Sequence, residues 1–259
     1  MHTQMMSVNK TSDTKTILFG LLTKNSGKWL PNVLKNLEQY ITFFDDYKCL
    51  ILDGNSNDNT IEIGNNWCNV DPSKRNFLQQ PTKNLERGQS LTEARNYVVN
   101  FFKNDFGENV FLMLLDTDSP NAVPFEGFET CFNTAHEWDA LFANQRNCYY
   151  DVWALRDEGC PNDYQINARI TGNWDVRHLQ TPKPISLGFH PVRSAFGGAG
   201  IYKTTSIKDA KYYCKSKVKM PDGNVYVLPV CEHVPFHLDM VSRGCKLFVN
   251  CQWLIGDHE

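Results

Sequence analysis

The strongest constraint on the fold of this chain is a run of five apolar residues that ends in two acids. The run lies in the segment FLMLLDTDSP, residues 111–120. An unbroken apolar run of this length is typical of a strand buried on both faces, as in a parallel sheet covered by helices. Because a carboxylate inside such a core would be costly, we expect Asp116 and Asp118 to lie where the strand leaves the sheet.

Strand-like and helix-like segments alternate through the first half of the chain. Strands are predicted at 16–22, at 47–53, at 76–80 and in the segment that ends at the two acids. Helices are predicted at 26–44, 57–68 and 90–102, the last of them opened by a capping box of Ser90 and Glu93. This alternation predicts an α/β fold with a mostly parallel, Rossmann-like sheet flanked by helices, in which ligands collect beyond the carboxyl ends of the strands.

The second half of the chain has a less regular pattern. Residues 126–143 predict a helix, and residues 224–230 and 246–250 predict late strands. Pro235 suits the first helical position of a helix that Gly244 can end. We therefore expect a smaller mixed region laid over the parallel sheet, all within a single domain of 259 residues.

Composition disfavours several classes of function. The 26 basic and 29 acidic residues leave a net charge of −3, which provides no general attraction to nucleic acid or to an anionic membrane. No apolar window approaches the roughly 18 to 20 residues that span a bilayer, and the opening segment is too polar for a signal peptide. Nine cysteines, an odd count without a C-x-x-C pair, argue against a disulfide framework. These features predict a cytoplasmic protein whose cysteines are mostly free thiols.

Asp116 and Asp118 form the only D-x-D motif in the chain. Residues two apart on a strand point to the same side, about 6–7 Å apart by strand rise. Hard cations such as Mg²⁺ and Mn²⁺ take oxygen ligands and often use only one or two protein carboxylates, with water and substrate phosphates completing the shell. A solvated turn that carries two acids is the alternative. The position at the end of a buried strand favours the metal site.

Two further motifs accompany the predicted strands and helices. The segment DGNSNDNT, residues 53–60, leads from a strand into a helix, and its Asp53 can accept hydrogen bonds from a base or ribose. The segment GQSLTEARN, residues 88–96, places Arg95 within a helix, where its forked guanidinium suits a diphosphate. A plain strand-to-helix turn and an ordinary surface arginine are the alternatives.

The order of these motifs resembles that of known glycosyltransferases. DGNSNDNT is similar to the DDGSTDNT signature of polysaccharide-synthase-type glycosyltransferases, and an ARN segment followed by a strand ending in D-x-D continues the same order. The segment YYDVWALRD, residues 149–157, resembles part of fungal capsule-associated mannosyltransferases and of glycosyltransferases of large DNA viruses such as the chlorella viruses. The later segments FGGAGIYK and CEHVPFH fit the same group. Gly54 departs from the signature, which has a second aspartate at that position.

The resemblance implies a GT-A fold with a nucleotide-binding half at about 15–120 and a half for the sugar and acceptor at about 121–259. It implies that Mn²⁺ or Mg²⁺ binds Asp116 and Asp118 and neutralises the departing diphosphate. The residues that it places around the donor are Thr23, Lys24, Asn25, Asp53, Arg95, Thr117, Gly197 and Gly198.

The same resemblance suggests roles for acidic and histidine residues in the second half. Glu232 would be the catalytic base, His237 the third metal ligand, and Asp151 the next candidate for the base. One alternative makes His237 a packing or cap histidine and Glu232 a surface acid. Another is a structural zinc site, whose ligands would be Cys231, His233, His237 and Cys245.

These observations together predict a metal-dependent glycosyltransferase. Its donor would be a UDP- or GDP-sugar, and its acceptor a glycan or another hydroxyl compound. The alternatives are a sugar-1-phosphate nucleotidyltransferase and a non-catalytic carbohydrate-binding protein. The first strand ends in LLTKNSGKW rather than in the glycine-rich, arginine-bearing loop of the nucleotidyltransferases, which disfavours the first alternative.

Overall fold

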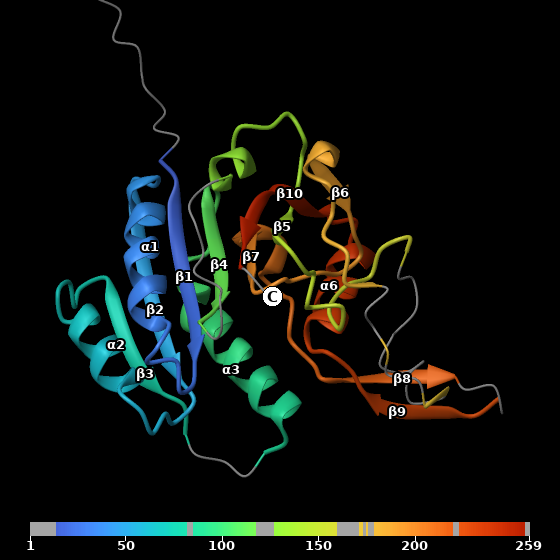
Figure 1. The fold of residues 1–259 in the computed structure, drawn as a ribbon, viewed down its shortest axis with the longest axis horizontal. Coiled ribbons are helices and arrows are strands. Elements are labelled where there is room, and N and C mark those ends of the chain that lie inside the picture. Colours follow the sequence, from blue (N-terminus) through green and yellow to red (C-terminus); the bar gives the residue numbers. More distant parts are fainter. Residues whose placement is uncertain are drawn as a thin grey trace, which may run out of the picture.

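The computed structural model describes residues 14–81, 85–117, 127–159, 171–172, 175, 179–219 and 223–256. Eight strands in this part of the chain form one sheet, with helices on both faces (Figure 1). These strands are β1 (Thr16–Thr23), β2 (Asp46–Asp53), β3 (Arg75–Gln79), β4 (Val110–Asp116), β5 (Ala140–Gln145), β6 (Phe189–Pro191), β7 (Ala199–Lys203) and β10 (Leu247–Ile255). The helices are α1 (Leu30–Thr42), α2 (Thr60–Cys68), α3 (Arg87–Phe101), α5 (Thr204–Ile207) and α6 (His233–Ser242), with short 3₁₀ turns η1 (Lys103–Asp105), η2 (Phe128–Cys131) and η4 (Ile185–Leu187). The strand order is β3-β2-β1-β4-β7-β5-β10-β6.

The first four strands form the parallel half of the sheet. β1 pairs with β2 on one side and with β4 on the other, and β2 pairs with β3. The register sets Thr23 opposite Asp53 and Leu22 opposite Asp116, so these three central strands end at the same edge. The strands predicted from the apolar runs are confirmed here, and so is the parallel α/β arrangement.

Alternate residues of the central strands pack on opposite faces of the sheet, as the pleat of a strand requires. On β4, Leu112 and Leu114 belong to the core cluster that contains Val98 of α3. Met113 belongs to the cluster on the other face, which contains Leu37 of α1. Because each face is covered by a helix, both sets of side chains are buried, and the strand sequence reads as an unbroken apolar run.

The second half of the chain continues the same sheet, whereas the sequence predicted a region laid over it. β7 runs antiparallel between β4 and β5, and β10 lies parallel to β5 and antiparallel to β6. The helix predicted at 126–143 is wrong, because only a 3₁₀ turn forms within its described part and β5 follows. Every residue of β5 is buried between two partner strands. Pairing and burial on both sides outweigh the local helical pattern.

Two helix starts that were predicted from a capping box and from a proline also differ from the structure. α3 begins at Arg87, so Ser90 lies inside the helix and does not cap it. α6 begins at His233, which puts Pro235 third in the helix instead of first. Proline is tolerated there because the first four N–H groups of a helix have no partner within the helix. Residues 152–154, within the segment YYDVWALRD, form a turn.

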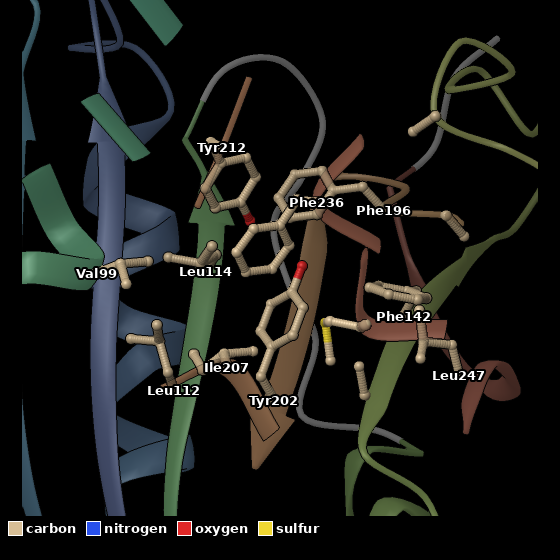
Figure 2. Close-up of a cluster of buried hydrophobic side chains, with 14 of the residues drawn as sticks. Val99, Leu112, Leu114, Phe142, Phe196, Tyr202, Ile207, Tyr212, Phe236 and Leu247 are labelled. Carbon is tan, nitrogen blue, oxygen red and sulfur yellow. The ribbon is translucent and has the colours of Figure 1, made fainter. Parts of the chain in front are cut away.

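The chain between β7 and β10 brings α6 to the α3 face of the sheet. After α5 it forms an antiparallel ribbon of β8 (Lys215–Lys219) and β9 (Val225–Pro229), which projects from the sheet (Figure 1). Tyr202, Tyr212 and Phe236 pack together beside β4, with the rings of Tyr212 and Phe236 stacked at 3.9 Å between centroids (Figure 2). This aromatic packing fixes the start of α6, where Glu232 lies.

Eight of the nine cysteines lie in the described residues, and all eight are unpaired, as predicted. Cys160 lies outside the described residues. No helix in the described part of the chain is both long enough and apolar enough to cross a bilayer.

Candidate functional site

Two loops at the carboxyl edge of the sheet are held together by hydrogen bonds. One follows β1, and the other follows β2 and contains DGNSNDNT. The Asn25 N–H donates to Ser56 Oγ over 2.7 Å, and the Ser26 N–H donates to Thr60 Oγ1 over 2.8 Å. Side chains of the motif thus accept from backbone N–H groups of the neighbouring loop, and these bonds hold the rim of the site together.

Asp53 organises its own loop in this arrangement. Its carboxylate is fully buried, with Oδ2 accepting the Ser56 N–H at 2.9 Å and Oδ1 accepting the Ser56 hydroxyl. Thr23, on the adjacent strand, is buried as well, whereas Lys24 and Asn25 are exposed. Of the residues predicted to hold the nucleotide here, Lys24 and Asn25 are therefore the accessible ones, and a nucleotide contact by Asp53 stays a prediction.

The strand alternation of β4 separates Asp116 from Thr117. Asp116 follows Leu112 and Leu114 on the α3 face, where it meets Arg95. Thr117 is fully buried, and its hydroxyl donates to the Leu22 carbonyl over 3.0 Å. Thr117 therefore anchors the end of β4 to β1, and a contact of Thr117 with the donor stays a prediction.

Arg95 bridges two carboxylates that are far apart in the sequence. Its Nε donates to Glu232 Oε1 over 2.8 Å, and its Nη2 donates to Asp116 Oδ1 over 3.1 Å. The guanidinium also lies over the Phe196 ring, 4.6 Å from the centroid. Burial opposes its charge, but the neighbouring Asp116 and Glu232 raise the pKa of Arg95 well above its usual range. Arg95 is only 2% exposed, so it is a buried bridge and neither a surface arginine nor an accessible diphosphate ligand.

Asp151 joins this group through the glycine segment. Its Oδ2 accepts the Gly197 N–H over 3.1 Å, and the next carbonyl, of Gly198, accepts the Asp116 N–H over 3.0 Å. Burial, opposed in part by the Gly197 bond and reinforced by the charges of Asp116 and Glu232, raises the pKa of Asp151 to about 7. The structure thus brings Asp116 and Glu232 to one guanidinium and places Asp151 on the adjoining glycine segment. The raised pKa of Asp151 suits proton transfer near neutral pH.

His237 has no ring nitrogen available for a metal in this structure. Its Nδ1 is hydrogen-bonded to Ser194 Oγ at 3.0 Å and its Nε2 to the Tyr202 hydroxyl at 2.9 Å, and the side chain is fully buried. Burial, and to a lesser extent Arg95, lower the pKa of His237 to about 3, so the ring is neutral. The arrangement matches the packing alternative for His237, and we do not propose it as a metal ligand.

A divalent cation still fits the carboxyl end of β4. The described residues contain no group of three or more metal-binding side chains, which also leaves the zinc alternative without support. Asp118 lies outside the described residues. The side chain of Asp116 is 26% exposed, and Mg²⁺ commonly binds through one or two carboxylates together with water and substrate phosphates. Asp116 fits this mode of binding, with the nearby acids adding negative potential.

The sequence contained no signal for the bridge itself. Arg95 and Glu232 are separated by 137 positions, and neither belongs to a motif that specifies the other. Phe196, which lies under the guanidinium, was also missed. It directly precedes the glycine pair, so its position in FGGAGIYK was the one available hint.

Comparisons with known proteins find similarity in fold only. No protein-family model matches the chain, and no curated protein matches it by sequence. Among solved structures, a mannosyltransferase from Pyrobaculum calidifontis in complex with GDP-Man and Mn²⁺ superposes with a TM-score of 0.51 at 11% identity. The glucosyl-3-phosphoglycerate synthase of Mycobacterium tuberculosis also gives 0.51 at 11% identity. Both alignments cover 95% of this chain, but only 57% and 73% of the respective neighbours.

The match extends over nearly the whole chain. Both neighbours are nucleotide-sugar glycosyltransferases of GT-A type. This chain therefore has the GT-A fold.

Proposed function

We propose that this protein is a glycosyltransferase that moves a sugar from a nucleoside diphosphate donor to a hydroxyl acceptor, with Mn²⁺ or Mg²⁺ at Asp116. The observation that carries the proposal is that Asp116 and Glu232 share Arg95, while Asp151 binds the adjoining glycine segment, at the carboxyl edge of a GT-A sheet. Ligands of open α/β sheets bind at this edge. The solved neighbours include complexes with GDP-Man and Mn²⁺ and with Mn²⁺, UDP and phosphoglyceric acid, which supports a donor and a cation of these classes.

The chain's own residues account for the proton transfer in this reaction. The acceptor oxygen bonds to the anomeric carbon, its proton passes to a carboxylate, and the bond to the nucleoside diphosphate breaks. The cation, when bound, neutralises charge on the departing diphosphate. Asp151 is the favoured base, because it is paired with no described cation, whereas Oε1 of Glu232 accepts from Arg95. Glu232 then acts by holding Arg95 in place.

No described feature favours the alternative functions. A carbohydrate-binding protein would not need a raised carboxyl pKa beside the glycine segment, and the loop after β1 carries no arginine in its described residues. The narrower kinship with fungal and viral enzymes rests on residues 149–157 and on the segments FGGAGIYK and CEHVPFH, and it stays a prediction. So does the cytoplasmic location.

A thermal-shift experiment tests the proposed function directly. UDP, GDP and their sugars should raise the melting temperature when Mn²⁺ is present, since a ligand that binds only the native state stabilises it by mass action. A concentration of about 100 times Kd adds roughly 2.7 kcal/mol. The same nucleotides with excess chelator are the control. Failure of every nucleotide sugar to stabilise the protein with either metal would reject the proposal.

The assignment of Asp151 predicts a specific pH dependence. Because the raised pKa leaves Asp151 protonated below about 7, transfer should increase as the pH rises through that value. Asp151→Asn should lower turnover by roughly 10²-fold or more and remove this increase of the transfer rate with pH. Glu232→Gln is the matched comparison. If Glu232→Gln abolishes the increase of rate with pH while Asp151→Asn retains it, the base is Glu232, as the sequence predicted first.

A further inference from the structure

Asp116 is the weaker and more accessible of the two carboxylate partners of Arg95. Its Oδ1 and Oδ2 lie 3.1 and 3.4 Å from Nη2, compared with 2.8 Å from Nε to Glu232. The Asp116 side chain is 26% exposed, whereas that of Glu232 is 7% exposed. A positively charged solute that reaches this edge of the sheet therefore meets Asp116 first.

We propose that Arg95 is a positioning residue that competes with the divalent cation for Asp116. In the metal-free protein the guanidinium neutralises Asp116, and cation binding requires Asp116 to turn from Arg95. The proposal rests on the metal-dependent transfer proposed above. It adds that the charge at Asp116 is balanced in both states, by Arg95 before the cation binds and by the cation afterwards.

Arg95 keeps other contacts when it loses Asp116, which makes the exchange feasible. Its Nε remains on Glu232 and its planar group remains over the Phe196 ring. A buried guanidinium without any carboxylate would be strongly destabilising, but here Glu232 still balances its charge. Nη1 has no hydrogen-bond partner in the described structure, so the guanidinium is not locked by bonds from every nitrogen.

The proposal predicts opposite effects of two substitutions on cation affinity. Arg95→Gln removes the positive charge that competes for Asp116, so Mn²⁺ should bind at least about fivefold more tightly. Glu232→Gln leaves Arg95 with Asp116 as its one acidic partner among the described residues and adds uncompensated positive charge, so Mn²⁺ should bind at least about fivefold more weakly. If the role of this bridge were only structural, the two substitutions would not change the Mn²⁺ affinity in opposite directions. Removing either Arg95 or Glu232 would then disturb Asp116 in the same way.

The measurement is Mn²⁺ binding followed by the electron paramagnetic resonance signal of free Mn²⁺, without nucleotide or acceptor. Arg243→Gln is the matched control, since Arg243 pairs with Asp239 at 3.1 Å on the surface and away from the site. Circular dichroism and melting temperature verify folding of each variant. If Arg95→Gln does not fold, Arg95→Lys replaces it, because a single ammonium cannot span two carboxylates as the fork does. This variant should still bind Mn²⁺ more tightly than the wild type.

Unchanged or weaker Mn²⁺ binding by the folded Arg95 variants would overturn the competition. So would a wild-type protein that binds no Mn²⁺ at all. Neither outcome decides whether the chain binds nucleotide sugars, because the thermal-shift experiment measures that separately. The failures of the two proposals are therefore distinguishable.

Discussion

Asp116→Asn should reduce sugar transfer by roughly 10³-fold, because the amide keeps the shape of the side chain but removes the charge that would hold the cation on the diphosphate. The substitution should also abolish the Mn²⁺-dependent part of nucleotide binding. Arg95 retains Glu232 as a partner, so the fold should persist. Initial rates of transfer, together with melting temperatures with and without Mn²⁺, measure both effects.

Asp239→Asn provides the matched control for Asp116→Asn. Asp239 also pairs with an arginine, Arg243, at 3.1 Å, but half of its side chain is exposed and the pair joins two turns of α6. Surface pairs of this kind contribute about 0–1 kcal/mol. Asp239→Asn should therefore leave transfer and Mn²⁺ dependence unchanged. Near-normal transfer by Asp116→Asn would show that Asp116 is not the metal carboxylate.

Gly197→Ala should destabilise the protein by about 2–5 kcal/mol, combining backbone strain and overpacking. Gly197 has φ of +66°, and a Cβ there would lie 2.7 Å from the Ala143 carbonyl oxygen. The obstacle is the backbone of β5, which cannot turn aside as a flexible side chain can. Any relief must shift the Gly197 N–H from Asp151, so turnover should fall as well. Urea denaturation measures the loss of stability.

Gly244→Ala separates the two causes. Gly244 has φ of +86°, but a Cβ there would meet no atom within 4 Å. Gly244→Ala should lower the free energy of unfolding only through backbone strain, by about 1–2 kcal/mol, and leave turnover unchanged. Equal losses of stability for the two variants would show that the approach of the glycine segment to β5 is not close enough to matter.

The fold was predictable where a strand is covered on both faces by helices. The apolar runs of β1, β2 and β4 specify buried parallel strands without any knowledge of their partners, because each run is contiguous. β5 was misread as part of a helix. Its residues carry no distinguishing period, and its neighbours in the sheet, β7 and β10, come from much later in the chain.

The residues of the candidate site likewise divide into those that could be predicted from the sequence and those that could not. Asp53 and Asp116 were placed correctly at strand ends, since a strand end is a local property of the sequence. His237 was assigned to a metal from its position in the chain, but the hydroxyls that occupy its nitrogens come from Ser194 and Tyr202. Those partners lie on other segments, and only the packing of α6 reveals them.

The sequence by itself determined the parallel half-sheet, the polar loops at its carboxyl edge and the accessibility of an acid at the end of β4. These depend on apolar periodicity and turn chemistry, which neighbouring residues encode. Tertiary structure alone decided that Asp116 and Glu232 share Arg95, and that Asp151 reaches the glycine segment. The physical reason is that the contact between Arg95 and Glu232 joins α3 to the start of α6, and the order of strands in the sheet sets the distance between them.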